Sequence, residues 1–64
     1  MKKYKVREVL DLLKNDGWYI ARTRGDHRQL KNDTKKGCVT LSGAMTDVID
    51  QGTLNSIWKQ AGWK

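Results

Sequence analysis

The chain contains one histidine, His27, and two arginines, Arg24 and Arg28, lie within three residues of it. Histidine is the side chain that ordinarily exchanges a proton near neutral pH. A general acid or base acting on a phosphodiester needs such a pKa, and neighbouring guanidinium groups stabilise charge on the phosphoryl oxygens. The spacing fits metal-free cleavage of RNA in which the RNA's own 2′-hydroxyl attacks the phosphate. The alternative is that His27 is an ordinary surface residue, which a lone histidine near a turn more often is.

Basic residues are concentrated in one part of the chain. Residues 22–36 contain two acidic residues against six basic ones, which are Arg22, Arg24, Arg28, Lys31, Lys35 and Lys36. Residues 39–58 contain no Lys or Arg. Because clustered cations bind phosphates and release their counterions, this segregation indicates a nucleic-acid partner contacted by these six residues. The alternative is a solvated hairpin.

Length and composition limit the possible classes of protein. With 64 residues and a net charge of +6, the chain is too short for an enzyme with a cleft between two domains, and we expect a single domain over residues 1–64. No stretch approaches the ~20 apolar residues of a membrane span, and the N-terminus lacks the apolar region of a signal peptide. No membrane association is therefore expected.

The lone cysteine, Cys38, cannot form an intramolecular disulfide, which favours a reducing compartment, here the cytoplasm. We expect it on a strand as a small buried thiol. One His and one Cys cannot build a zinc site, and the sequence contains no Gly-rich phosphate loop. We therefore expect no metal and no small-molecule cofactor.

An amphipathic helix is predicted over residues 5–15, with Gly17 at its C-terminal cap. Its apolar residues recur at helical spacing: Val6, Val9, Leu10, Leu12 and Leu13. A second helix is predicted after Gly52, with Thr53 as N-cap and Gly62 at the end. Its apolar stripe is Leu54, Ile57, Trp58 and Ala61. Residues 42–51 have no clear pattern and are expected to form a loop.

Three strands are predicted between the helices. Residues 18–24 alternate, with Trp18 and Ile20 on one face and Tyr19, Ala21 and Thr23 on the other. Gly25-Asp26 forms a tight turn to a strand over residues 27–31, and a second turn at 32–37 leads to a strand over 38–41. The order predicts an α+β domain of helix, three-stranded antiparallel sheet and helix, with one sheet face left open.

The aromatic residues divide between core and surface. We expect Trp18 and Trp58 in the core and Trp63 packed at the end of the chain. Tyr19 has two equally supported interpretations, a structural role or stacking on a base or partner.

The chain resembles the HicA family of small toxins from bacterial and archaeal toxin-antitoxin pairs over nearly its whole length. The matching segments are Leu12-Leu13 with Gly17-Trp18, residues 22–27 ending in Gly25-Asp26-His27, the strand Val39–Leu41, and the closing run Gly52–Gly62. The resemblance implies a double-stranded-RNA-binding-like fold, mRNA interferase (endoribonuclease) activity through His27, arrest of translation and growth, and a HicB-like antitoxin that covers the basic face or the histidine.

Two positions depart from the family pattern. The usual Gly-Ser-His is Gly-Asp-His here, and the Pro and second His that often follow the third strand are replaced by residues 42–45. The Asp26 carboxylate is expected either to favour the imidazolium form of His27 and shift it toward the acid role, or to repel the phosphate and slow the reaction. Without a second His, no residue is an obvious complementary base.

Two other functions fit the same features. A non-catalytic RNA-binding module would share the fold and the charge, without chemistry at His27. A surface that chiefly binds a protein would hold RNA weakly, with an affinity that falls steeply as salt is added.

Overall fold

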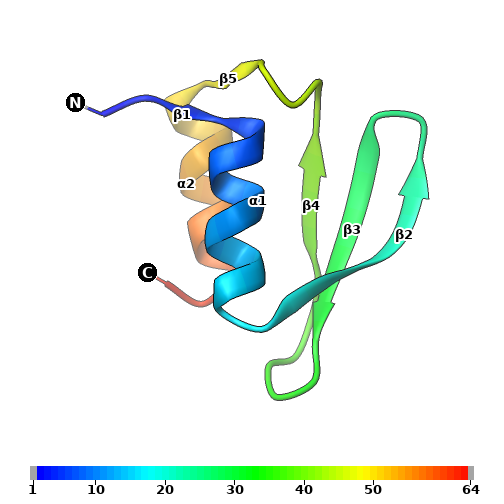
Figure 1. Ribbon diagram of the computed structural model, residues 1–64. Coiled ribbons are helices and arrows are strands. Elements are labelled where there is room, and N and C mark those ends of the chain that lie inside the picture. Colours follow the sequence, from blue (N-terminus) through cyan, green and yellow to red (C-terminus); the bar gives the residue numbers. More distant parts are fainter. Residues whose placement is uncertain (1, 64) are drawn as a thin grey trace.

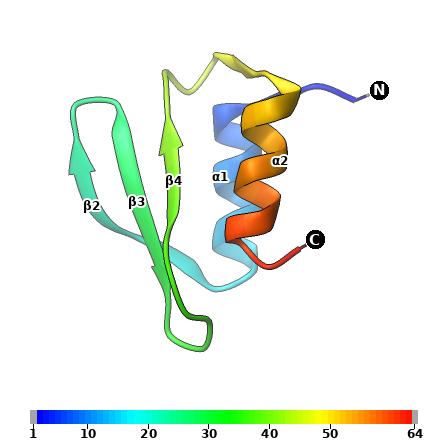
Figure 2. The ribbon, with the colours of Figure 1, turned by 180° about the vertical axis from the view of Figure 1, so that it is seen from behind.

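Two helices cover one face of a three-stranded antiparallel sheet in the computed structural model, which describes residues 2–63 (Figure 1). The elements in chain order are β1 (Tyr4–Lys5), α1 (Val6–Asn15), β2 (Trp18–Arg24), β3 (His27–Asn32), β4 (Val39–Ser42), β5 (Val48–Ile49) and α2 (Gln51–Gln60). Seen from behind, both helices still lie on the same side of the sheet (Figure 2). The predicted α+β, double-stranded-RNA-binding-like fold is confirmed.

Helix α1 forms where the apolar spacing predicted it. Its buried residues are Val6, Val9, Leu10 and Leu13. Leu12, also predicted in this stripe, is exposed because at about 100° per residue it lies outside the arc that the other four define. The Lys5 amide donates to Glu8 Oε1 at 2.8 Å at the start of the helix, and Gly17 follows its end with a φ of 94°.

Helix α2 begins earlier than predicted. Asp50, not Thr53, is the N-cap: its carboxylate accepts the Thr53 amide at 3.1 Å and the Thr53 hydroxyl at 2.7 Å. A carboxylate is as good an N-cap as a hydroxyl, and these bonds, the hydroxyl first, lower the pKa of Asp50. Thr53 is therefore inside the first turn.

A second, two-stranded sheet is formed by β1 and β5. Strand β5 lies in residues 42–51, where a loop was predicted, and Lys5 of β1 was predicted to begin the first helix. Tyr4 pairs with Ile49 and Lys5 with Val48 in antiparallel register. The Val6 amide then donates to the Asp47 carbonyl at 2.9 Å. This pairing satisfies a backbone donor at the start of α1, which has no partner within the helix.

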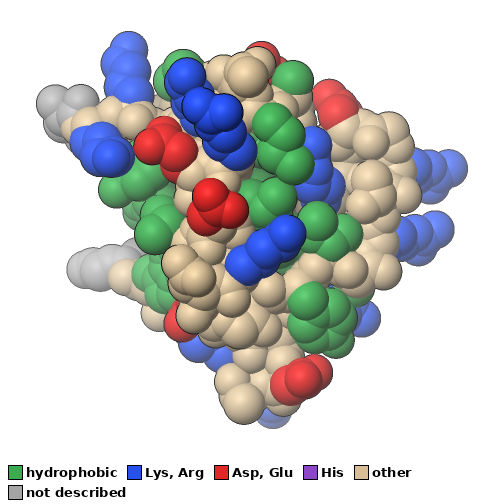
Figure 3. Space-filling view, viewed as in Figure 1, with side chains coloured by type: hydrophobic (Ala, Val, Ile, Leu, Met, Phe, Trp, Pro, Cys, Tyr) green, Lys and Arg blue, Asp and Glu red, His purple; other side chains and the backbone are tan. Residues whose placement is uncertain are grey.

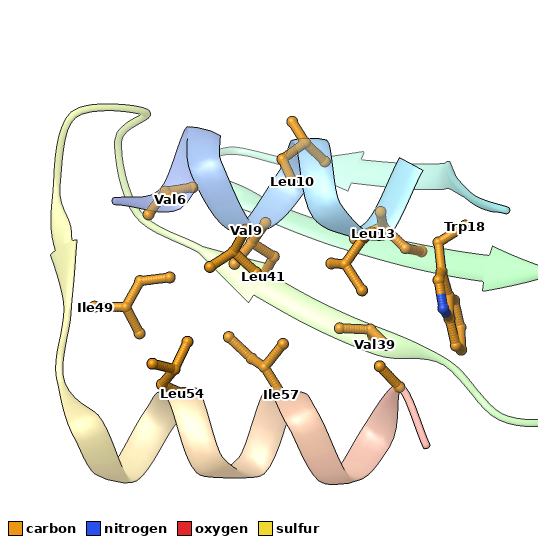
Figure 4. Close-up of a cluster of buried hydrophobic side chains, with 12 residues drawn as sticks. Val6, Val9, Leu10, Leu13, Trp18, Val39, Leu41, Ile49, Leu54 and Ile57 are labelled. Atoms are coloured by element: carbon orange, nitrogen blue, oxygen red, sulfur yellow. The ribbon is translucent and has the colours of Figure 1, made fainter. Parts of the chain in front are cut away.

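The hydrophobic core lies between α1, α2 and the helix-facing side of the sheet (Figure 4). Trp18, Leu30, Val39 and Leu41 are buried on the sheet side. The half-buried Trp58 packs against this core, its ring 5.5 Å from that of Tyr4 and 5.2 Å from that of Trp63. Trp18 is therefore in the core as predicted, whereas Trp58, also predicted there, is only half-buried and packs against the core from outside.

Cys38 differs from its predicted placement, since it is exposed and lies one residue before β4. Within residues 2–63, neither helix has the length and apolar character needed to cross a lipid bilayer.

One carboxylate joins three separate parts of the chain. Asp16 Oδ2 accepts from Lys35 Nζ at 2.7 Å, from Trp63 Nε1 at 2.9 Å and from Trp18 Nε1 at 3.2 Å. Lys35 Nζ also donates to the Ala61 carbonyl at 3.1 Å, at the C-terminal end of α2. These contacts, with Lys35 the largest contributor, lower the pKa of the Asp16 carboxyl. We call Asp16, Trp18, Lys35 and Trp63 the Asp16 cluster.

Substitution Asp16→Asn is expected to lower the thermal unfolding midpoint at neutral pH. It should also reduce the fall of that midpoint as the pH is lowered. Because the folded-state pKa is depressed, the stabilisation is present above the unfolded-state pKa, about 3.9, and is lost as pH falls below it through the folded value. Asp50 keeps its own acid dependence. Circular dichroism melts between neutral pH and about pH 2 measure both effects.

The matched control is Asp33→Asn, which removes an exposed carboxylate from the same loop as Lys35. If the two variants melt alike at every pH, the Asp16 cluster does not stabilise the fold.

Candidate nucleic-acid interface

His27 is placed by a two-residue turn. Arg24 ends β2 and pairs directly with His27, which begins β3, so that only Gly25 and Asp26 form the connection. Gly25 has a φ of 61°, which other residues rarely adopt and which hairpin turns of this length need. The predicted hairpin is confirmed, and its tip extends away from the helices (Figure 1).

An extra residue in β2 decides which side chains share a face with His27. Ile20 pairs with Leu30, but the next pair is Arg22 with Gln29, so the register shifts by one residue at Ala21 in a β-bulge. Leu30 is buried beneath the helices, and alternation places Gln29 and its partner Arg22 on the other face. The predicted placement of Thr23 on the same face as Tyr19 is therefore wrong, because Thr23 pairs with Arg28 on the helix-facing side.

The sheet face turned away from the helices, which we call the open face, collects the basic side chains of β2. It carries Arg22, Arg24 and Tyr19 from β2, with His27, Gln29 and Lys31 from β3 and Thr40 from β4. Arg22, Arg24, His27, Gln29 and Thr40 line a shallow concavity of about 260 Å³. Lys and Arg side chains project from this side of the hairpin (Figure 3).

His27 stands at the wall of this concavity with its ring mostly in solvent. Its Nδ1 lies 3.2 Å from Asp26 Oδ1, and the two side chains are 65% and 62% exposed. Among residues 2–63, no hydrogen bond engages Nε2. A carboxylate beside one ring nitrogen favours the proton there and leaves the other nitrogen to exchange a proton with a ligand.

Arg28 does not join His27 on the open face. It pairs with Leu41, which is buried on the helix-facing side, and is itself half-buried. Its Nη1 donates to the carbonyls of Asp26, at 3.2 Å, and Gly43, at 3.0 Å. Arg28 therefore ties the hairpin turn to the end of β4.

The three predicted lysines also separate. Lys31 lies on the open face opposite Tyr19. The Lys35 ammonium is bonded to Asp16 and to the Ala61 carbonyl. Lys36 is exposed in the loop between β3 and β4, which follows the end of β3 that is farthest from His27. Of the predicted site residues, the structure brings together Arg22, Arg24 and His27, with Lys31 further along the same face.

Sequence reasoning did not select Gln29 and Thr40, which complete the wall of the concavity. The signal that could have found them is strand alternation: Gln29 is two residues from His27, and Thr40 lies between the apolar Val39 and Leu41.

Comparison with known proteins identifies a family for the chain. A family model described as the HicA toxin of bacterial toxin-antitoxin pairs matches residues 6–63. No curated protein matches the chain.

Arg24→Ala and Arg28→Ala remove the same charge but are expected to act differently. Arg28→Ala loses two hydrogen bonds to backbone carbonyls and should destabilise the fold by on the order of 1 kcal/mol. Arg24→Ala should leave the melting temperature nearly unchanged and elute from a heparin column at lower salt than Arg28→Ala. Earlier elution of Arg28→Ala with unchanged stability would instead place Arg28 in the binding surface.

Proposed function

The chain belongs to the HicA toxin family, and on that premise we propose that it is an endoribonuclease that cleaves mRNA on the open face of its sheet. The observation that carries the proposal is the concavity in which Arg22, Arg24 and His27 meet. Guanidinium groups bind phosphate with charge and fixed geometry, and imidazole exchanges protons near neutral pH. The concavity thus combines a phosphate site with an acid–base group.

In the proposed reaction the RNA supplies the nucleophile. The 2′-hydroxyl oxygen attacks the adjacent phosphorus, the bond from phosphorus to the 5′-oxygen breaks, and the products are a 2′,3′-cyclic phosphate and a 5′-hydroxyl. Arg22 and Arg24 stabilise the charge that develops on the phosphoryl oxygens. His27 takes the hydroxyl proton at Nε2, and the departing 5′-oxygen gains a proton from water or from the imidazolium. The steps require no metal ion.

Asp26 is proposed as a positioning residue for His27. Its carboxylate lies 3.2 Å from Nδ1, where it stabilises a proton on that nitrogen and leaves Nε2 unprotonated in the neutral ring. Nε2 then has the lone pair that a general base needs. This arrangement suits a base role for His27, in place of the acid role expected from an imidazolium form, and repulsion of the phosphate by Asp26 is the alternative that substitution of Asp26 tests.

Family membership implies an antitoxin partner. We propose that it is HicB-like and neutralises the toxin in the cytoplasm by covering the open face. Binding there would exclude RNA from the concavity and would also stabilise the small toxin fold by mass action.

Substitution His27→Ala is expected to lower the rate of RNA cleavage by about 10² to 10⁴-fold, the usual contribution of a general acid or base. Growth arrest and mRNA fragmentation on induction should disappear, while folding and most RNA affinity remain. The measurements are growth, mRNA integrity in the first minutes and end-group analysis of fragments made by purified protein. A chelator should leave the purified reaction unchanged.

The matched control is Gln29→Ala, which alters the same wall without removing an acid–base group. If native chain and His27→Ala bind RNA equally and neither cuts it, the chain is a non-catalytic RNA-binding module. If RNA binding by both is weak and lost with modest salt while the antitoxin still binds, the open face serves a protein.

Substitution Asp26→Asn is expected to lower kcat about tenfold, part of the general acid–base contribution, with little change in KM. The reason is loss of the carboxylate that holds the proton on Nδ1. Steady-state cleavage of a short RNA separates the two constants, and Asp33→Asn makes the same charge change in the loop between β3 and β4. A lower KM with unchanged kcat would mean that Asp26 chiefly repels phosphate.

A further inference from the structure

Tyr19 presents an aromatic ring on the same face as the concavity. It is 46% exposed, lies on β2 at the edge of the sheet, and pairs across the strands with Lys31. We propose that Tyr19 and Lys31 form a subsite for an unpaired nucleobase and its phosphate, so that the substrate is single-stranded RNA. This inference rests on the proposed function.

The other aromatic residues are committed to the fold. Trp18 is buried and donates to Asp16, and Trp63 donates to the same carboxylate. The rings of Tyr4 and Trp63 both pack against Trp58. Within residues 2–63, Tyr19 takes part in no aromatic pair or hydrogen bond of this kind, so its ring is free to stack on a ligand.

The placement of Tyr19 suits a strand of RNA that runs along the hairpin. On β3, Lys31 is four residues from His27, a separation of about 13 Å. The pair Arg22 and Gln29 lies between these two positions. A backbone held by Arg24 and Arg22 over His27 can therefore continue to Lys31 and bring a nearby base over the Tyr19 ring.

This geometry favours a single strand over a duplex. Bases stack well on tyrosine whatever their identity, but only when they are unpaired and turned out of a helix. A duplex keeps its bases inside and offers the protein phosphates and 2′-hydroxyls. The arginines could bind either form, whereas the Tyr19 ring adds affinity only for the single strand.

The test measures binding without cleavage. The probe is a fluorescein-labelled 2′-O-methyl oligoadenylate of about twelve nucleotides, a length typical of single-strand sites, which lacks the hydroxyl needed for the proposed reaction. A second probe of equal length carries abasic sugar–phosphate units, and a third is the corresponding duplex. Anisotropy titrations compare the native chain with Tyr19→Ala and with Tyr19→Phe, which keeps the ring.

We expect Tyr19→Ala to weaken binding of the single strand by about tenfold and Tyr19→Phe by less than about twofold, since stacking is lost only in the first. The abasic probe and the duplex should bind all three proteins alike. Lys31→Ala should lower the salt dependence of single-strand binding by about one phosphate contact.

Equal affinity of native chain and Tyr19→Ala for the single strand overturns the subsite and leaves cleavage at His27 standing. If Tyr19→Ala binds the single strand as the native chain does but is no longer neutralised by the co-expressed antitoxin, Tyr19 belongs to a protein interface. That outcome also overturns the subsite. Failure of the native chain to bind any probe or to cut unmodified RNA overturns the proposed function itself. Folding of each variant is checked by circular dichroism.

Discussion

The hairpin of β2 and β3 has to meet two demands on opposite faces of one sheet. At its base, Trp18 and Leu30 must lie beneath the helices to complete the core. Towards its tip, the arginines must share a face with His27. With strict alternation from Trp18, Arg22 and Arg24 would fall on the helix-facing side. The bulge at Ala21 absorbs one residue and lets the same strand satisfy both demands.

The basic residues have different roles in the structure, although they lie close together in the sequence. Arg22 and Arg24 project into the concavity, and Lys31 lies further along the open face. Arg28 and Lys35 are instead bonded to backbone carbonyls, and Lys35 also to Asp16. A cation fixed in this way adds to the net charge and to the field that attracts RNA, but the fold holds it away from the concavity. Net charge therefore overstates the number of phosphate contacts.

Much of the architecture was predictable because it follows from short-range patterns. The stripe of Val6, Val9 and Leu13 predicts α1, and Gly25-Asp26 predicts the turn that begins β3 at His27. The bulge at Ala21 was not predictable, because it results from two separate constraints on the hairpin. Leu30 must be buried in the core, and the two-residue turn must pair Arg24 with His27. Pairing of β1 with β5 was also missed, because two-residue strands show no period and gain their partners only in the folded chain.

The Asp16 cluster constrains the order in which the chain folds during its synthesis. Asp16 is followed 47 positions later by one of its hydrogen-bond donors, Trp63, and 19 positions later by another, Lys35. Such long-range contacts form late, after the local helices and the hairpin. The contacts that join α1, the sheet and the end of α2 are therefore incomplete on a nascent chain until Trp63 has left the ribosome.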